Sequence, residues 1–158
     1  MTGDYDWGTS NRRIAVYVKL LDKKNNNQPV YFYATHFDGD KTEARTNSAQ
    51  IIVSRAKSYT GASNLQNLSS RLYVVGDLNC TSEEEAYSTL ASSLQSARET
   101  APVTTHMGSY NGFASGTGVA IDHIFYAGPC TPRSFRVISR KYGPAYISDH
   151  YPILFEAN

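Results

Sequence analysis

The chain has 158 residues, of which 41% are hydrophobic and 18% are charged, a composition typical of one soluble domain with a sizeable core. Its 15 Lys and Arg against 14 Asp and Glu give a formal net charge of +1, which excludes a strong overall attraction to nucleic acid or membrane surfaces. No apolar stretch approaches the roughly 20 residues that span a bilayer, and residues 1–10 are polar. We therefore expect no membrane span and see no signal peptide, and Cys80 and Cys130, far apart in sequence, leave the compartment undecided.

The first part of the chain predicts a hairpin followed by a helix. Apolar residues occupy every second position over residues 14–20, which indicates a strand with one apolar face. The polar segment 23–29 and the apolar run 30–35 predict a second strand, which ends at His36. The Asp-x-x-Glu pattern of Asp40 and Glu43, with the helical spacing that follows, predicts a capped helix over residues 41–59 that stops at Gly61.

The next strand is the apolar run 72–75, which ends in Gly76 and leads into Asp77 and Asn79. A strand directs alternate side chains to the same side, so we expect Asp77 and Asn79 to point into one cleft. A carboxylate can bind a hard cation or hold a water, and an amide can bind an anionic oxygen. The same residue types are common in turns and helix caps, so this pattern alone leaves both interpretations open.

After this motif the chain predicts a second helix and a long connection. Three glutamates at positions 83–85 are typical of a solvated helix start, and the helix is expected to run to about residue 90. Residues 101–120 have no regular periodicity, and long loops of this kind are often functional. Within them, Asn111 is a candidate substrate-binding amide at a cleft rim, although Asn111-Gly112-Phe113 fits a simple turn equally well.

The last part of the chain predicts three strands and two acidic positions of interest. Residues 121–126 form an apolar run around Asp122, whose carboxylate needs a partner because burying it alone is costly. Residues 134–139 predict an alternating strand. A final strand is expected to open with the adjacent pair Asp149 and His150, near Pro152.

The polar residues at or near strand ends make up the set that phosphoester hydrolysis requires. It contains carboxylates for Mg²⁺, an amide and an imidazole for phosphoryl oxygens, and an Asp-His pair for general base catalysis: His36, Asp77, Asn79, Asp122, Asp149 and His150. Zinc is a competing interpretation, but the four histidines show no His-x-His or His-x-x-x-His spacing, and oxygen ligands suit a harder ion. A Ser-His-Asp hydrolase fits poorly because no Gly-x-Ser-x-Gly motif is present.

Five ordered sequence blocks over residues 13–155 resemble the endonuclease/exonuclease/phosphatase superfamily, which includes the DNase I-like nucleases. The resemblance implies an α/β fold, the C-terminal part of a four-layer α/β/β/α sandwich with a mixed, largely antiparallel sheet and flanking helices, as a single domain over residues 1–158. The blocks are Ala34-Thr35-His36-Phe37-Asp38, Val75-Gly76-Asp77-Leu78-Asn79, Asn111-Gly112-Phe113, Ile121-Asp122-His123-Ile124-Phe125 and Ser148-Asp149-His150-Tyr151-Pro152.

The resemblance also implies a role for each catalytic residue. His150 would be the general base or acid at the reacting phosphorus, oriented by Asp122. Asp77 would position or activate the attacking water, and Asn79 would hold that water or a phosphoryl oxygen. His36 would donate to the phosphate in the transition state. The implied reaction is in-line attack of water on a phosphoester.

Cofactor and substrate follow from the same resemblance. Asp149 would sit at the metal, with Asp77 as a second ligand, and the ion would be Mg²⁺ or Mn²⁺. The substrate would be a phosphorylated small molecule or a nucleic acid. The family is often exported, but residues 1–10 show no sign of export, so localisation stays open.

The family's domain has an earlier half that supplies a metal-binding glutamate and an asparagine, and neither has a counterpart here; Asn11 and Glu43 lie in the wrong context. We therefore expect an apolar sheet face without its packing sheet. Three explanations stay open: a partial sequence, a chain completed by a second polypeptide, and a homodimer. Two functions also stay open, a metal-dependent phosphoesterase and a non-catalytic domain that binds phosphate or nucleic acid.

Overall fold

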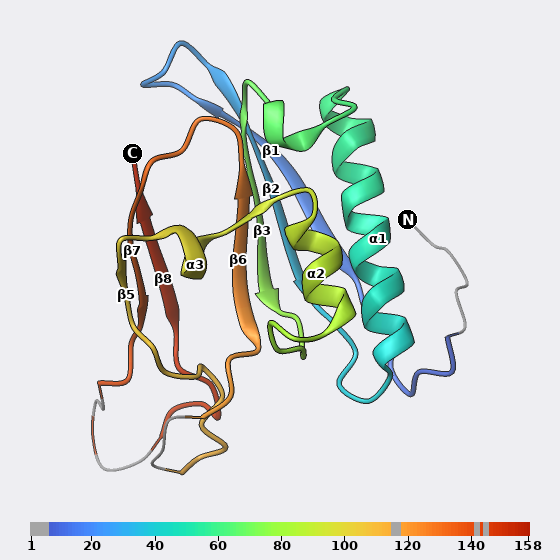
Figure 1. Ribbon diagram of the computed structural model, residues 1–158, viewed down its shortest axis with the longest axis vertical. Helices are drawn as coiled ribbons and strands as arrows, with labels where there is room; N and C mark the ends of the chain where they lie inside the picture. The colour runs from blue at the N-terminus through green and yellow to red at the C-terminus, as the bar shows by residue number, and fades with distance from the viewer. Residues whose placement is uncertain (1–6, 115–117, 141–142, 144–145) are drawn as a thin grey trace.

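Two β-sheets and a layer of helices form the part of the chain that the computed structural model describes, residues 7–114, 118–140, 143 and 146–158 (Figure 1). The larger sheet has the order β1-β2-β3-β6-β4, built from β1 (Ala15–Asp22), β2 (Gln28–His36), β3 (Arg71–Asp77), β6 (Asp122–Ala127) and β4 (Gln95–Ser96). The smaller sheet has the order β5-β7-β8, built from β5 (Val103–Thr104), β7 (Pro132–Val137) and β8 (Ile153–Ala157). Paired strands are antiparallel except β2 with β3 and β5 with β7, so both sheets are mixed.

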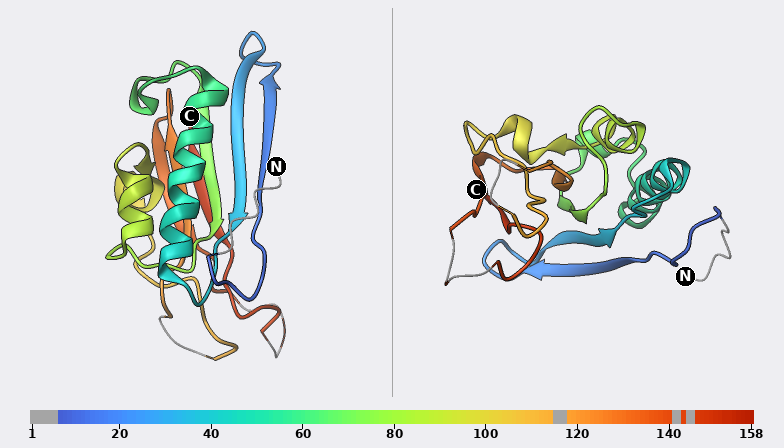
Figure 2. Two further views of the ribbon diagram at one scale, coloured as in Figure 1. Left: turned by 90° about the vertical axis from the view of Figure 1, so that its right-hand side faces the viewer. Right: turned by 90° about the horizontal axis from the view of Figure 1, so that it is seen from below.

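Helices α1 (Thr42–Thr60) and α2 (Glu85–Ala91) lie against one face of the larger sheet (Figure 2), with the short helices η1 (Leu65–Asn67) and α3 (Ala97–Thr100) in the connections. The prediction of α1 is confirmed within one residue at each end, and Gly61 stops it in the left-handed conformation with φ of 71°. Among the described residues, no helix has the length and apolar character that crossing a membrane requires.

The predicted cap of α1 was wrong in its residue. The N-cap position is Lys41, and no side chain there caps the helix. Instead Asp38 accepts hydrogen bonds from the backbone amides of Asp40 and Lys41, at 3.0 and 2.8 Å. These amides lie at and just before the N-cap position, so Asp38 fixes the turn that leads into α1 and does not cap its first turn.

Other element boundaries also differ from the sequence prediction. Helix α2 begins only at Glu85, because residues 82–84 form a turn before it. The connection over residues 101–120 contains β5 and an isolated bridge between Tyr110 and Val119. Strand β8 begins at Ile153, so Asp149 and His150 lie in the loop before this strand and do not open it.

The apolar side chains gather in two cores, one on each face of the larger sheet. Between this sheet and the helices, Tyr33, Leu72 and Phe125 are at most 2% exposed. Between the two sheets, Tyr126 stacks on Phe155, with ring centroids 5.4 Å apart. The helices and the smaller sheet therefore hold the larger sheet from opposite sides, although the smaller sheet reaches only part of its face.

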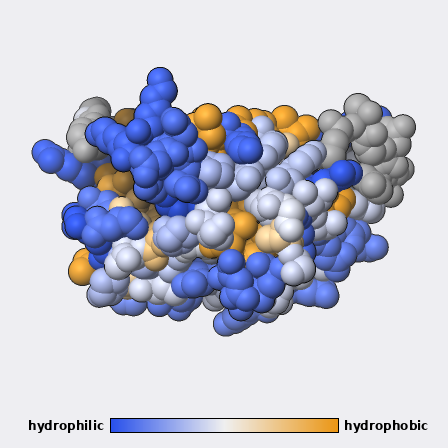
Figure 3. Space-filling view, turned by 90° about the horizontal axis from the view of Figure 1, so that it is seen from above, coloured by the Kyte–Doolittle hydropathy of each residue, from blue (hydrophilic) through white to orange (hydrophobic). Residues whose placement is uncertain are grey.

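Strand β1 carries apolar side chains that no described part of the chain covers. Val16, Val18 and Leu20 are 53%, 42% and 54% exposed, whereas Tyr17, which points to the opposite face, packs against the helix-side core. The view from above shows hydrophobic surface along one edge of a largely hydrophilic end (Figure 3). The predicted apolar face is present, and it extends beyond the cover that the smaller sheet provides.

This asymmetry predicts very different costs for two similar truncations. Leu72→Ala lowers the free energy of unfolding by about 2–5 kcal/mol because it leaves a cavity in the helix-side core, whereas Leu20→Ala changes it by less than about 0.5 kcal/mol. Urea unfolding of the two variants beside the unchanged chain measures both effects. An equal cost at both positions would contradict the exposed β1 face and would indicate that another molecule covers it in solution.

Candidate active site

Three neighbouring strands bring three polar side chains together at one end of the larger sheet, where the strands begin or end. His36 is the last residue of β2, Asp77 is the last residue of β3, and Asp122 is the first residue of the antiparallel strand β6. The strand register places His36 beside Asp77, and Asp77 beside Asp122. His36 Nε2 lies 3.3 Å from Asp77 Oδ2. Backbone pairing in the sheet therefore sets the spacing of these three groups.

Gly76 permits this register. Its φ of 144° is a conformation that residues with side chains rarely adopt, and a Cβ built on it would lie 1.8 Å from the backbone oxygen of Thr35. Any larger residue would push β3 away from β2 at the pair that precedes His36 and Asp77. The glycine before the acid is thus a steric requirement of the site.

His150 reaches the same end of the sheet from the loop before β8. Its Nδ1 lies 2.7 Å from Asp122 Oδ2, and its Nε2 lies 3.7 Å from Asp77 Oδ2. Tyr110 packs edge-on against the imidazole, with ring centroids 5.1 Å apart, and also pairs with His150 through a β-bridge. Because Nδ1 contacts a carboxylate, the neutral imidazole carries its proton on Nδ1 and leaves Nε2 free to accept another.

Burial and the charges of neighbouring groups shift the pKa values of His150 and Asp77. Burial by itself lowers the pKa of His150. The hydrogen bond to Asp122 and the negative charges of Asp122, Asp77 and, least, Asp149 outweigh burial, so the pKa of the imidazole is raised overall. Burial raises the pKa of Asp77; the amide of Asn79 opposes this, and the charge of Asp122 adds to it. Perturbed pKa values in a converging cluster are typical of functional sites.

Asn79 shapes the turn that follows β3. It adopts the left-handed conformation with φ of 48°, which asparagine tolerates. Its backbone amide donates to Asp77 Oδ1 at 2.8 Å, and its Nδ2 donates to the backbone oxygen of Phe37 at 3.0 Å. One Asp77 oxygen is therefore held by the turn while the other faces two imidazoles. Within the described residues, the side-chain oxygen of Asn79 has no hydrogen-bond partner and can meet a ligand.

Asp149 and Asn111 lie beside the cluster. The backbone oxygen of Asp149 accepts from the amide of Asn111 at 2.7 Å, and its carboxylate lies 3.4 Å from the hydroxyl of Ser148. The Asn111 side chain is buried, donates to the backbone oxygen of Ser148 at 3.2 Å and accepts from the amide of Phe113 at 2.8 Å. Its amide is thus engaged within the loops, and a contact between Asn111 and substrate stays a prediction.

The cluster can contribute to a divalent metal site. Asp77, Asp122 and His150 each offer a ligand atom, and these atoms lie within 4.8 Å of one another. Because Asp122 and His150 already pair with each other, Asp77 is the donor best placed for a cation. Carboxylate oxygens suit Mg²⁺ or Mn²⁺, but an octahedral shell needs more donors than these three groups supply.

Arg45 is the main functional residue that sequence reasoning missed. Its side chain is 8% exposed, and its terminal nitrogens donate to the backbone oxygens of Asp38 and Gly39, both at 3.3 Å, and to Thr42 Oγ1 at 3.0 Å. It also forms a 2.6 Å ion pair with Glu84, which was expected to be solvated but is only half-exposed. Arg45 thereby ties the loop after β2 to the loop after β3. Its place on the helix face that carries small buried residues was the available sequence signal.

His123 stands next to Asp122 in sequence but belongs to the core. Its side chain is buried, and its Nε2 lies 2.8 Å from the backbone oxygen of Cys80. Tyr87 packs against it at right angles, with ring centroids 5.0 Å apart. Burial lowers the pKa of this histidine. Alternation along β6 therefore separates a site carboxylate from a structural imidazole.

These features define the class of molecule as an α/β domain with an acid-imidazole cluster at the ends of neighbouring strands. The model of the endonuclease/exonuclease/phosphatase family matches residues 10–150, and the chain belongs to that family. No curated protein matched the sequence significantly.

Solved structures of similar fold include two from Bacteroides. A mannosyl-6-phosphatase of B. thetaiotaomicron is 22% identical, with a TM-score of 0.84, over 96% of this chain and 59% of that one. An endonuclease/exonuclease/phosphatase of B. vulgatus is 28% identical, with a TM-score of 0.83, over 100% of this chain and 59% of that one. D. rerio TDP2, complexed with a single-stranded DNA product, is 18% identical, with a TM-score of 0.71, over 95% of this chain and 63% of that one.

These matches confirm the predicted family and the DNase I-like α/β fold class. The chain spans less than two thirds of each of these neighbours. The structure brings together His36, Asp77, Asp122 and His150 with Asn79 adjoining them, whereas their catalytic roles stay predictions.

The Asp122 contact predicts a measurable change in the titration of His150. Asp122→Asn removes the negative charge beside Nδ1, so the pKa of His150 falls. NMR titration of the imidazole resonances in the two proteins measures the change. The resonances of the exposed His106 provide an internal control for the sample conditions. An unchanged pKa at His150 would contradict the 2.7 Å pairing in solution.

Removal of the Arg45 tie should destabilise the fold. Arg45→Met leaves Glu84 and the backbone oxygens of the loop after β2 without their donor, and we expect a loss of about 2–4 kcal/mol of unfolding free energy. Arg55→Met is the matched control, since Arg55 lies exposed on the same helix and should cost less than about 0.5 kcal/mol. Equal costs in urea unfolding would rule out the tie as a source of stability.

Proposed function

We propose that this chain carries the acid-imidazole part of the active site of a divalent-metal-dependent phosphoesterase, which hydrolyses a phosphodiester or phosphomonoester by in-line attack of water. The supporting observation is the position of His150, with Nδ1 2.7 Å from Asp122 and Nε2 3.7 Å from Asp77. An imidazole held in one tautomer by a carboxylate is suited to general acid-base catalysis.

Each residue has a task in this reaction. Asp122 keeps the proton of neutral His150 on Nδ1, so Nε2 can take a proton from, or return one to, an oxygen at phosphorus. Asp77 orients the attacking water through the oxygen that faces the two imidazoles. His36 donates to a phosphoryl oxygen, and the free amide oxygen of Asn79 holds the water.

The metal would neutralise charge that develops on the phosphoryl oxygens. Family members generally use divalent metals, and Asp77 is the best-placed donor, with Asp149 close enough to affect the titration of His150. Mg²⁺ and Mn²⁺ both suit these oxygen ligands. The remaining ligands would come from water, substrate or a further polypeptide.

The similar solved structures indicate the substrate class only broadly. One acts on a mannosyl phosphate by its name, and another was solved with a single-stranded DNA product, so a phosphorylated small molecule and a nucleic acid are both compatible with this fold. Either substrate would have to place a phosphoester at the end of the sheet where His36, Asp77 and Asp122 lie side by side.

A second candidate function is phosphate binding without turnover by this chain alone. Two observations favour it: only three potential ligand groups converge among the described residues, and β1 exposes an apolar face. Both fit a domain that gains metal ligands and a packing sheet from an additional half or from a second copy of the chain.

Hydrolysis of bis-p-nitrophenyl phosphate distinguishes the two functions. We expect turnover with Mg²⁺ or Mn²⁺ that EDTA abolishes and that His150→Ala lowers by about 10²–10⁴-fold, whereas His106→Ala, at an exposed position, has no effect. If His150 acts as the base, the rate rises as pH passes upward through its raised pKa. Turnover that survives His150→Ala would sink the mechanism. Phosphate binding with no turnover of this diester or of the monoester p-nitrophenyl phosphate, at any metal or protein concentration, would establish the second function.

A further inference from the structure

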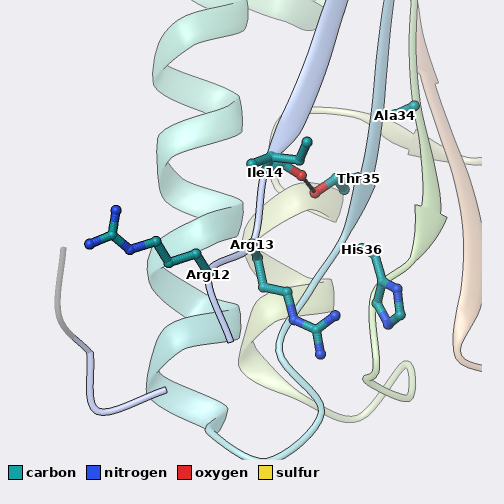
Figure 4. Close-up of a pocket in the computed structure, with 6 residues that line it drawn as sticks. All are labelled: Arg12, Arg13, Ile14, Ala34, Thr35 and His36. Atoms are coloured by element: carbon teal, nitrogen blue, oxygen red, sulfur yellow. Dashed lines mark hydrogen bonds between the residues drawn. The ribbon is translucent and has the colours of Figure 1, made fainter. Parts of the chain in front are cut away.

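A hollow of about 380 Å³ adjoins the acid-imidazole cluster on the side of β1 and β2 (Figure 4). His36 belongs to both places, because its ring lines the hollow and its Nε2 lies 3.3 Å from Asp77. The remaining walls come from the segment before β1 and from the end of β2: Arg12, Arg13, Ile14, Ala34 and Thr35. The hollow therefore offers space directly beside the predicted reaction site.

Arg13 presents its guanidinium to this space. Figure 4 shows the side chains of Arg13 and His36 extending toward the same end of the strands, whereas Arg12 extends away. The side chain of Arg13 is 29% exposed. Within the described part of the chain, its one ionic contact is from Nε to Asp38 Oδ2 at 3.8 Å, too long for a hydrogen bond, and its terminal nitrogens have no partner.

The ion pair with Asp38 leaves the terminal nitrogens of Arg13 without a hydrogen bond among the described residues. Asp38 already accepts from the amides of Asp40 and Lys41, and the buried Arg45 lies next to its backbone oxygen. Burial disfavours the charged form of Asp38, but these hydrogen bonds and the charges of Arg13 and Arg45 lower its pKa overall, so Arg13 acts on Asp38 through its charge and not through a hydrogen bond. The two terminal nitrogens of Arg13 therefore stay available to a ligand.

The chemistry of this pair of side chains selects an oxyanion. A guanidinium presents parallel donors in a planar fork that matches two oxygens of one phosphate, and His36 adds a donor on the same side. The neighbouring cluster is acidic, with Asp77 and Asp122 side by side, so Arg13 also supplies the positive charge that a polyanionic ligand needs near them.

We propose that the hollow binds a second phosphate group of the substrate, adjacent to the scissile one, with Arg13 as the main contact and His36 shared between the two groups. The identity of the scissile phosphate rests on the function proposed above. The consequence is a preference for ligands with two neighbouring phosphates, whether in a bisphosphorylated small molecule or along a nucleic acid strand.

Binding of inorganic pyrophosphate and orthophosphate to the whole chain, without metal, tests this site independently of turnover. We expect pyrophosphate to bind about tenfold more tightly than orthophosphate, because it reaches both positions, and Arg13→Gln to remove most of that advantage while orthophosphate binding changes little. NMR titration that follows the His36 resonances measures both affinities. Urea unfolding of Arg13→Gln shows whether the variant is still folded.

Arg136→Gln is the matched control for loss of one positive charge. Arg136 lies on β7 in the smaller sheet, half-exposed, with a similarly loose ion pair of 3.9 Å to Glu156. We expect it to leave both affinities unchanged. An equal loss in the two variants, or an unchanged pyrophosphate preference in Arg13→Gln, would overturn the proposal.

Two further binding measurements distinguish a nucleic acid strand from a small bisphosphate as the molecule that supplies the second phosphate. A short single-stranded oligonucleotide whose affinity falls in Arg13→Gln would identify a nucleic acid strand as the ligand, and a fall confined to pyrophosphate would identify a small bisphosphate. Both results support the site. Because the assay needs neither metal nor hydrolysis, an Arg13-dependent preference in a chain that shows no turnover would reject the proposed catalysis and keep this inference.

Discussion

The close approach of β2 and β3 at Gly76 is the constraint on which the site depends. Only a residue without a side chain lets the two strands pair at that point, since a Cβ would meet the backbone oxygen of Thr35 at 1.8 Å. The next residue pair in the register is His36 with Asp77, and β6 adds Asp122 on the other side. The positions of His36, Asp77 and Asp122 on the sheet thus follow from backbone geometry, whereas Asn79 and His150 lie in the loops that follow β3 and precede β8.

This division explains what the sequence could predict. His36, Asp77 and Asp122 belong to strands whose apolar pattern is readable, so their places at strand ends could be predicted, whereas the register that sets them side by side is seen only in the structure. Arg45 could not be found in this way, because its partners are backbone oxygens and a glutamate 39 positions away, which no local pattern records. The same applies to Asp38, which holds the turn before α1 from outside the expected motif.

The two loops at the site depend on interactions of different strength. Arg45 is buried and bonded to both loops that flank Asp77, so this side of the site has a rigid support beneath it. The loop that carries His150 relies on Asn111, whose amide holds the backbone of Ser148, and on the packing of Tyr110 against the imidazole. A buried asparagine with its hydrogen bonds satisfied inside the protein fixes this loop, and its contact with a substrate stays a prediction.

The raised pKa of His150 links stability and chemistry in opposite directions. A group whose pKa is higher in the folded than in the unfolded chain stabilises the fold most at pH values below its unfolded pKa, and that contribution is lost as pH rises through the folded pKa. General base catalysis requires the neutral imidazole, which is the form that predominates once this contribution is lost. In the proposed mechanism, the charges of Asp122 and Asp77, which favour protonated His150, would therefore set the lower pH limit for its action as a base. A cation bound at Asp77 would weaken the attraction between Asp77 and protonated His150 and lower the pKa of the imidazole. The lower pH limit for base catalysis would then move to lower pH, so metal binding and formation of the neutral base would favour each other.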